Sequence, residues 1–182
     1  MTTITNLSDF QALDPFFRII EEALVGLTDG EHFFDLLAED VEFDYVITVP
    51  NYPRHVVGRT AVAELYRPYG QALTLNRCFD LAVHHDRETG TVVLEYASEG
   101  QVVATGAAYT NRYISVLTIE HREVTRWRDY LDPVAVFDAL GWPQRHRLPP
   151  TGPDSDPGIE ALVETLGLDL DNGHLSPPTS EA

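Results

Sequence analysis

The nucleophilic and basic side chains limit the chemistry that this sequence can support. All 12 basic residues are arginines, so no lysine amine is present for a Schiff base, for pyridoxal phosphate or for a phosphate-binding P-loop. The single cysteine, Cys78, excludes an intramolecular disulfide and a cysteine-based metal cluster. A lone cysteine is more often a small buried hydrophobic side chain than a nucleophile, and we interpret Cys78 in that way.

Histidine is the next side chain whose position bears on chemistry. His55 lies in a predicted loop before a helix, and an imidazole pKa of about 6.5 suits a proton carrier. A solvated loop side chain is the alternative for His55. His84 and His85 are adjacent on a predicted strand, so they point to opposite faces and cannot bind one metal ion there. The sequence has no His-x-x-x-His or His/Cys cluster, and we predict no metal site.

The composition indicates one globular domain with a strongly acidic surface. The chain has 182 residues, 43% of them apolar, and a formal net charge of −17. A surface of that sign repels phosphate groups, so we expect no binding to nucleic acid or to anionic membranes. The N-terminus lacks the charged and apolar regions of a secretory signal, and no apolar run approaches the roughly 18 residues of a membrane helix. We therefore expect a cytoplasmic protein.

The first part of the chain has helical spacing. Apolar residues recur at helical intervals over residues 8–27, with Ser8 as N-cap or, alternatively, with a start near Asp14 and Pro15 at the first position. A short helix is predicted for residues 31–37, a strand for 41–49 and a loop for 50–53. Thr60 is the predicted cap of a third helix, which Pro68 ends.

The second part has the alternation of β-strands. The pattern predicts strands over residues 78–85, 91–98, 108–120 and 123–131. Residues 101–104 either extend the second of these strands or belong to a bulge at Gly100. One or two helical turns follow at residues 134–140. Because helices precede a run of antiparallel strands, the fold class is α+β, with helices on one face of a twisted sheet.

The composition changes after Trp142, which sets a domain boundary. Residues 1–142 form the predicted domain, and residues 143–182 form an extension rich in Pro, Gly and Asp. Within the extension, residues 159–168 have the spacing of a short amphipathic helix, and the last residues have the composition of a disordered end.

Two stretches resemble the SnoaL-like/NTF2-like superfamily. The first reads AEDVEF at residues 38–43, followed by GRTAV at residues 58–62, and is similar to the family's first strand and the start of its third helix. The second reads NRY at residues 111–113 and WRDYLDP at residues 127–133, and is similar to the family's closing strands. The resemblance covers residues 9–142, and the Trp-Arg-Asp-Tyr element is its specific part.

The resemblance implies a fold, an assembly and a site. The implied fold is a cone-shaped α+β barrel, with three N-terminal helices packed on a curved antiparallel sheet, and the implied assembly is a homodimer built on the outer sheet face. In several family enzymes the aspartate of this element lies in the pocket as the acid or base, which here is Asp129. Strand alternation then points further side chains inward. The implied substrate-binding residues are Tyr45, Tyr66, Tyr96, Ser98, Asn111, Tyr113 and Trp127.

Such a pocket suits proton transfer. Burial disfavours a carboxylate charge and brings its pKa toward neutrality, and phenols beside it can donate hydrogen bonds to a developing enolate. We therefore expect a cofactor-free isomerase, cyclase or dehydratase acting on a hydrophobic metabolite, with Asp129 and His55 as proton carriers. The alternatives for Asp129 are an ion pair with Arg126 or Arg128, or a capping role. The alternatives for the whole chain are a non-catalytic binding or accessory domain of the same fold and a purely dimeric interaction module.

One family mechanism is disfavoured by the residues themselves. Limonene-type epoxide hydrolases resemble this chain at Asp129 but also use an arginine and a second aspartate, two residues apart, on the strand that matches residues 94–98. Tyr96 and Ser98 occupy those positions here. The sequence therefore lacks the charged groups of that relay.

Overall fold

The computed structural model describes residues 7–47, 49 and 52–142. These residues form four α-helices, two short 3-10 helices and six strands. The helical elements are η1 (Leu7–Leu13), α1 (Asp14–Ala23), η2 (Phe33–Leu36), α2 (Arg59–Tyr66), α3 (Tyr69–Ala72) and α4 (Pro133–Leu140). The strands are β1 (Leu37–Tyr45), β2 (His55–Val57), β3 (Leu73–Asp86), β4 (Thr91–Val102), β5 (Ala108–Glu120) and β6 (Glu123–Leu131). The predictions made for residues 143–182 lie outside the described residues.

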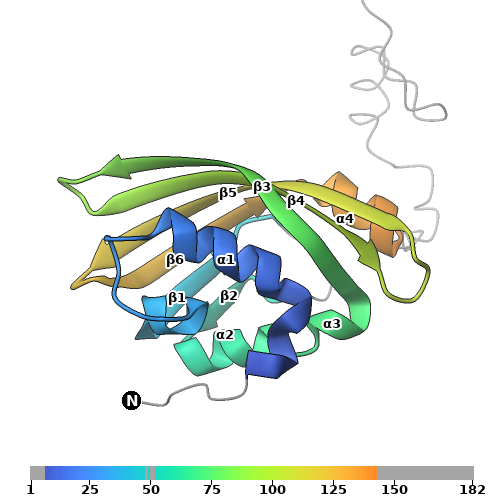
Figure 1. The fold of residues 1–182 in the computed structure, drawn as a ribbon, viewed down its shortest axis with the longest axis horizontal. Helices are drawn as coiled ribbons and strands as arrows, with labels where there is room; N and C mark the ends of the chain where they lie inside the picture. The colour runs from blue at the N-terminus through green and yellow to red at the C-terminus, as the bar shows by residue number, and fades with distance from the viewer. Residues whose placement is uncertain (1–6, 48, 50–51, 143–182) are drawn as a thin grey trace, which may run out of the picture. The chain divides into compact units, whose positions relative to one another are not determined.

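The six strands form one curved sheet, and α1 lies across one of its faces (Figure 1). The strand order is β2-β1-β6-β5-β4-β3, so the sheet does not close on itself. The α+β class and the helix-covered curved sheet are therefore confirmed. The sheet differs from a purely antiparallel one at a single pair, because β1 runs parallel to β6, with Phe43 opposite Trp127 and Tyr45 opposite Asp129.

The N-terminal helix begins where proline allows it. The helix α1 has Pro15 in its first positions, which confirms the alternative start near Asp14, and the preceding residues form the 3-10 helix η1. Its inner face meets a cluster of buried phenylalanines under the sheet. Phe17 stacks on Phe33 with ring centroids 4.6 Å apart, and Phe10 lies 4.8 Å from Phe34. This cluster holds the helical layer against the strands.

Several predicted boundaries are shifted. The short helix predicted for residues 31–37 is the four-residue η2, and the next strand starts at Leu37 rather than at Val41. The residue at the N-cap of α2 is Gly58, with a φ of +97°, and Thr60 lies inside the helix. A backbone with positive φ favours glycine, so Gly58 makes the turn into the helix. Thr60, which we predicted as the cap, comes two residues too late to cap it.

The hairpin between β5 and β6 is confirmed at its predicted bounds and has a tight turn. Its two central residues, His121 and Arg122, both have positive φ, at +51° and +66°, as in the two-residue turns that match strand twist. The Arg122 guanidinium donates to Asp29 Oδ1 at 2.6 Å, and the backbone carbonyl of Arg122 accepts from the backbone N–H of Asp29 at 3.0 Å. These contacts anchor the turn of the hairpin to the segment that follows α1.

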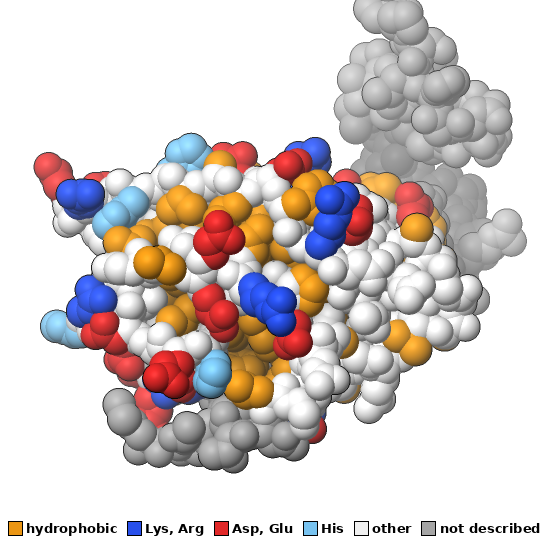
Figure 2. All heavy atoms as spheres, viewed as in Figure 1, with side chains coloured by type: hydrophobic (Ala, Val, Ile, Leu, Met, Phe, Trp, Pro, Cys, Tyr) orange, Lys and Arg blue, Asp and Glu red, His pale blue; other side chains and the backbone are white. Residues whose placement is uncertain are grey.

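The surface agrees with the acidic composition. Figure 2 shows acidic, basic and hydrophobic side chains interspersed over the viewed face, without a continuous basic patch on its described part. Within the described residues, no helix is long and apolar enough to cross a membrane.

Gly100 marks a close approach between strands that the sequence did not reveal. The strand β4 continues through Gly100 to Val102, as the first alternative predicted, and a register shift lies opposite Gly100, on β3 between Leu75 and Arg77. A Cβ atom on Gly100 would lie 2.2 Å from the Thr74 carbonyl oxygen. A side chain at this position therefore requires the two backbones to move apart.

We predict that Gly100→Ala lowers the free energy of unfolding by about 1–3 kcal/mol, the usual cost of overpacking a dense site. Gly70→Ala is the control, because its added Cβ meets only the Ala12 methyl group at 3.2 Å. Urea denaturation of both variants checks the prediction. Equal loss in the two variants would contradict the role given to the Gly100 contact.

Candidate active site

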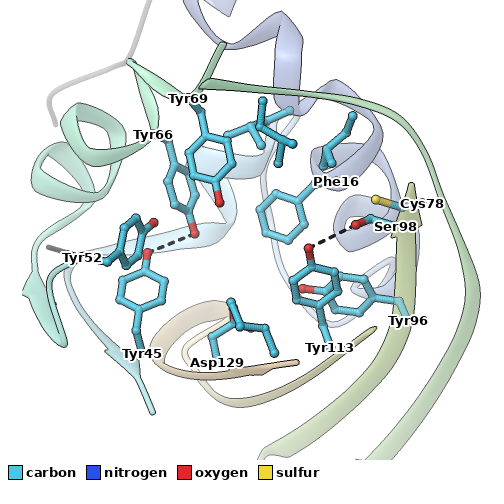
Figure 3. Close-up of a pocket in the computed structure, with 14 residues that line it drawn as sticks. Phe16, Tyr45, Tyr52, Tyr66, Tyr69, Cys78, Tyr96, Ser98, Tyr113 and Asp129 are labelled. Carbon is cyan, nitrogen blue, oxygen red and sulfur yellow. Dashed lines mark hydrogen bonds between the residues drawn. The ribbon is translucent and has the colours of Figure 1, made fainter. Parts of the chain in front are cut away.

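A pocket lies between the helical layer and the concave face of the sheet (Figure 3). Its cavity volume is about 60 Å³, well below the several hundred Å³ of an ordinary ligand pocket. Half of its 14 lining residues are aromatic, and they come from helices, strands and the loop before β2. The lining residues are Leu13, Phe16, Tyr45, Tyr52, Tyr66, Tyr69, Leu73, Leu75, Cys78, Tyr96, Ser98, Tyr113, Asp129 and Leu131.

Asp129 is the only charged side chain in this lining. Its carboxylate oxygen Oδ1 accepts a hydrogen bond from the Ser115 hydroxyl at 2.6 Å and one from the Trp127 indole N–H at 3.3 Å. The other oxygen, Oδ2, accepts no hydrogen bond from any residue that the structure describes. One oxygen is therefore held in place, and the other is free to meet a ligand.

Burial changes the acidity of this carboxyl group. The pKa of Asp129 rises from 3.8 to about 6, because the surrounding protein removes most of the water that would stabilise the charge. The hydrogen bonds from Ser115 and Trp127 act in the opposite direction and limit the rise in the pKa. The group therefore exchanges its proton near neutral pH, which is the range that a general base needs.

Among the described residues, Asp129 neither pairs with Arg126 or Arg128 nor caps a helix, the two alternatives that the sequence left open. No arginine among these residues forms an ion pair with Asp129, and the Arg126 guanidinium instead donates to Asp44 Oδ2 at 2.9 Å on the outer sheet face. The capping role belongs to Asp132, whose Oδ1 accepts from the Val134 backbone N–H at 2.9 Å at the start of α4. Asp129 thus lacks a partner of opposite charge.

A short chain of hydroxyls leads to Asp129. The Ser115 hydroxyl hydrogen is used on Asp129, so Ser115 Oγ accepts from the Tyr96 hydroxyl, 3.2 Å away. Strand register sets this geometry, because Ser115 lies directly opposite Asp129 and Tyr96 lies opposite Tyr113, two residues along. The pKa of Tyr96 is raised well above its usual value by burial, so Tyr96 acts here as a neutral donor.

A second chain of polar groups lies on the neighbouring strands. Asn111 Oδ1 accepts from the Asp132 backbone N–H at 3.0 Å, which fixes its amide nitrogen toward the Tyr109 hydroxyl at 2.8 Å. The Tyr109 hydroxyl lies 2.9 Å from that of Tyr113, which in turn lies 3.1 Å from Ser98 Oγ. These hydroxyls form a connected chain from Asn111 to Ser98, which lines the pocket.

The opposite wall presents further phenols. The Tyr45 hydroxyl donates to that of Tyr66 at 3.2 Å, which leaves the Tyr66 hydrogen directed elsewhere. Tyr69 lies beside Tyr66 with ring centroids 6.2 Å apart, and both hydroxyls point into the pocket in Figure 3. Burial raises the pKa of all three phenols, so they remain protonated donors when Asp129 ionises.

The pattern of a SnoaL-like domain matches residues 22–146, more than half of the chain. The chain belongs to the SnoaL-like family. Its similarity to the Bacillus subtilis (strain 168) protein YesE, which is uncharacterized, is 26% identity over 113 residues, or 62% of this chain and 77% of that one. The family assignment confirms the resemblance seen in the two sequence stretches.

Solved structures show the same fold. A putative isomerase from Bacillus subtilis superposes with a TM-score of 0.58 at 24% identity, over 75% of this chain and 96% of its own. The phenazine biosynthesis-related protein PhzB2 of Pseudomonas aeruginosa superposes with a TM-score of 0.55 at 16% identity, over 79% and 99%. A putative polyketide cyclase from Pseudomonas putida KT2440 gives 0.54 at 16% identity, over 72% and 97%. At these identities the likeness concerns the fold alone.

This SnoaL-like pocket brings together most of the residues that the sequence predicted for the site. The predicted residues in the lining are Tyr45, Tyr66, Tyr96, Ser98, Tyr113 and Asp129. Trp127 points inward as expected but lies in the core, with 1% of its surface exposed, and stacks on Phe43. Asn111 is also inward and buried, but both ends of its amide are engaged by protein groups.

His55 lies apart from the pocket. It is the first residue of β2 rather than a loop residue, and it is paired with Asp44 on the outer face of the sheet. Its Nδ1 lies 2.8 Å from Asp44 Oδ1, and about half of its side chain is exposed, at 52%. The structure does not bring His55 to Asp129.

Some lining residues escaped the sequence reasoning. The spacing of Tyr66 and Tyr69 suits either core packing or a pocket wall for Tyr69, and Tyr52 falls in a predicted loop with no role assigned; both residues line the pocket. Phe16 comes from α1, whose apolar stripe does not distinguish a residue facing a pocket from one facing the core. Ser115 was expected inward by alternation, but its short contact with Asp129 depends on the strand register. Within residues 7–47, 49 and 52–142 no group of three or more ligating side chains can hold a metal ion.

We predict that Ser115→Ala raises the pKa of Asp129 above its present value of about 6, because the lost hydrogen bond favours the charged form. Carboxyl-carbon NMR titration measures this pKa. Ser98→Ala is the control, since its hydroxyl contacts Tyr113 rather than Asp129. An unchanged pKa in Ser115→Ala would show that the hydroxyl does not stabilise the carboxylate.

We predict that Asp129→Asn stabilises the protein at pH 8 but not at pH 4. The folded-state pKa of about 6 lies above the usual 3.8, so the folded protein binds more protons than the unfolded chain between these values. Stability from this group is therefore present at low pH and is lost as the pH rises through 6. Removing the buried charge should add about 1–3 kcal/mol at pH 8. Urea denaturation of both proteins at the two pH values measures the difference, and a gain that is independent of pH would contradict this account.

Proposed function

We propose that this SnoaL-like protein is a cofactor-independent acid/base enzyme of the isomerase, cyclase or dehydratase type, acting on a small hydrophobic metabolite. The observation that carries the proposal is the Asp129 carboxylate in an aromatic pocket. Its pKa is about 6, and among the described residues it has no ion-pair partner and no hydrogen-bond donor to Oδ2. A partly buried base beside neutral phenols suits proton abstraction next to a carbonyl group.

The relatives support the same class of reaction. Similar structures include proteins described as a putative isomerase and as putative polyketide cyclases. Another, from Catenulispora acidiphila, has a ketosteroid isomerase-like fold and was solved in complex with trimethylamine, so a relative of this fold holds a small molecule. We extend to this chain only the general class, since the fold serves many functions.

The proposed step uses the two walls of the pocket together. Asp129 Oδ2 removes a proton from the carbon next to a substrate carbonyl, while Oδ1 stays held by Ser115. The carbonyl oxygen gains negative charge and accepts hydrogen bonds from Tyr66 and Tyr69 on the opposite wall. Asp129 then returns the proton to another carbon in an isomerisation. In a cyclisation the enolate instead attacks a second carbonyl, whose oxygen takes the proton from Asp129. In a dehydration the enolate expels a β-hydroxyl group, which leaves as water with that proton.

We also propose that the protein is a homodimer built on the outer sheet face. That face exposes the apolar side chains of Val57 and Ile114, which are 53% and 46% accessible in the single chain. The Asp44–Arg126 ion pair lies on the same face. Sedimentation or light scattering with Ile114→Glu tests the interface without altering the pocket.

We predict that Asp129→Asn lowers the rate of α-proton exchange of small cyclic aryl ketones by about 10²–10⁴-fold, the usual contribution of a general base. Exchange is followed by NMR in deuterated water, with ligand binding measured in parallel. In the wild type the rate should rise with pH through about 6 as Asp129 ionises. Asparagine keeps the shape and the Oδ1 acceptor, so binding should persist.

His55→Asn is the matched control, because this side chain lies on the outer face and should leave exchange unchanged. A large loss of exchange in His55→Asn would return His55 to the mechanism. Binding without exchange in both the wild type and Asp129→Asn would favour a non-catalytic binding domain over the enzyme.

A further inference from the structure

The pocket lining carries negative charge and no positive charge. Asp129 contributes a carboxylate, and no arginine or histidine is among the 14 lining residues. Arginines close in sequence are used elsewhere, since Arg126 pairs with Asp44 and lies half-exposed on the outer face. A ligand carboxylate or phosphate would therefore meet a negative group and no positive one. The lining excludes anionic ligands and leaves a net negative site without a counter-ion.

The rest of the lining suits a cation whose charge is spread over methyl groups. Seven of the lining residues are aromatic: Phe16, Tyr45, Tyr52, Tyr66, Tyr69, Tyr96 and Tyr113. Phenol oxygens carry negative partial charge, and an alkylated ammonium has little hydration to lose compared with a metal ion or a primary amine. The small cavity, about 60 Å³, matches a compact group and not an extended chain.

We propose that this pocket binds a compact alkylated ammonium group, with Asp129 as its counter-ion and the tyrosines as its aromatic wall. The inference concerns the charge of the ligand and does not rest on the proton transfer proposed above. It explains why a buried carboxylate is kept without an arginine partner. It also fits the formal net charge of −17, which attracts cations toward the protein from solution.

Among the titratable side chains of the pocket lining, Asp129 is the one whose charge changes between pH 5 and 8. Tyr45 faces it from β1, Tyr66 from α2, Tyr69 from α3 and Tyr96 from β4, and burial raises the pKa of each phenol. Further members of the lining are Tyr52 and Tyr113, with raised pKa values, and Cys78, whose pKa burial raises to about 12. A cation that needs the ionised carboxylate should therefore bind more weakly as the pH falls below about 6.

The test compares two molecules of the same shape, choline and its neutral isostere 3,3-dimethylbutan-1-ol, by NMR titration of the full-length protein at constant ionic strength. We expect choline to bind at least about tenfold more tightly at pH 8, the range of desolvated cation–aromatic contacts. Its affinity should fall about tenfold at pH 5, where about one carboxylate in ten is ionised. Equal or tighter binding of the neutral alcohol would overturn the inference.

Variants separate the pocket from general electrostatics. Asp129→Asn should reduce choline affinity to that of the neutral alcohol. Asp80→Asn removes the same charge from an exposed site and should leave choline affinity unchanged; asparagine suits its positive φ of +57°. Equal losses in the two variants would show that choline binding reflects surface charge alone and would overturn the inference. Since α-proton exchange is measured separately on ketones, either proposal can fail while the other stands.

Discussion

The structure depends on one partly buried carboxylate that has no partner of opposite charge among the described residues. Asp129 has Ser115 and Trp127 as its hydrogen-bond donors and aromatic rings as its surroundings. Two neutral donors lower the cost of burying a charge without removing it, so the group stays near its point of ionisation. An arginine in the same place would lower the pKa and fix the charge. The acid/base role and the affinity for a cation both follow from the absence of that arginine in the lining.

The fold holds this costly group through strand register. Ser115 meets Asp129 because β5 and β6 form a tight hairpin, and Tyr45 meets it because β1 inserts parallel to β6. The pairing of Phe43 with Trp127, stacked 5.1 Å apart and almost fully buried, locks this parallel register. Packing of the apolar core thus offsets the free-energy cost of holding the carboxylate at this position. The cost appears as a lower free energy of unfolding at high pH, where the carboxylate is charged.

The sequence predicted those parts of the fold that local patterns determine. The strands 108–120 and 123–131 were predicted at their observed bounds, since alternation and turn residues lie within a short stretch. The pairing of β1 with β6 was not, because it joins residues more than 80 positions apart and no local pattern encodes its direction. In the site, alternation gave the inward side chains, whereas the roles of Tyr52 and Tyr69 required the packing of loop and helix over the sheet. His55 was predicted in a loop, but it begins β2 on the outer sheet face, and a strand of three residues leaves no pattern to read.

The alternation of the last strand explains how an aspartate flanked by arginines stays unpaired. In the stretch from Arg126 to Asp129 the side chains point outward and inward in turn, so both arginines lie on the outer face while Trp127 and Asp129 lie inside. A slip of one residue would bring an arginine into the pocket and expose the indole to water, and the burial of Trp127 opposes it. The same tryptophan donates to Asp129 Oδ1, so the residue that fixes the register also solvates the charge. The isolation of the carboxylate is therefore a property of the strand pattern, and any proposal for the chemistry of this pocket must account for it.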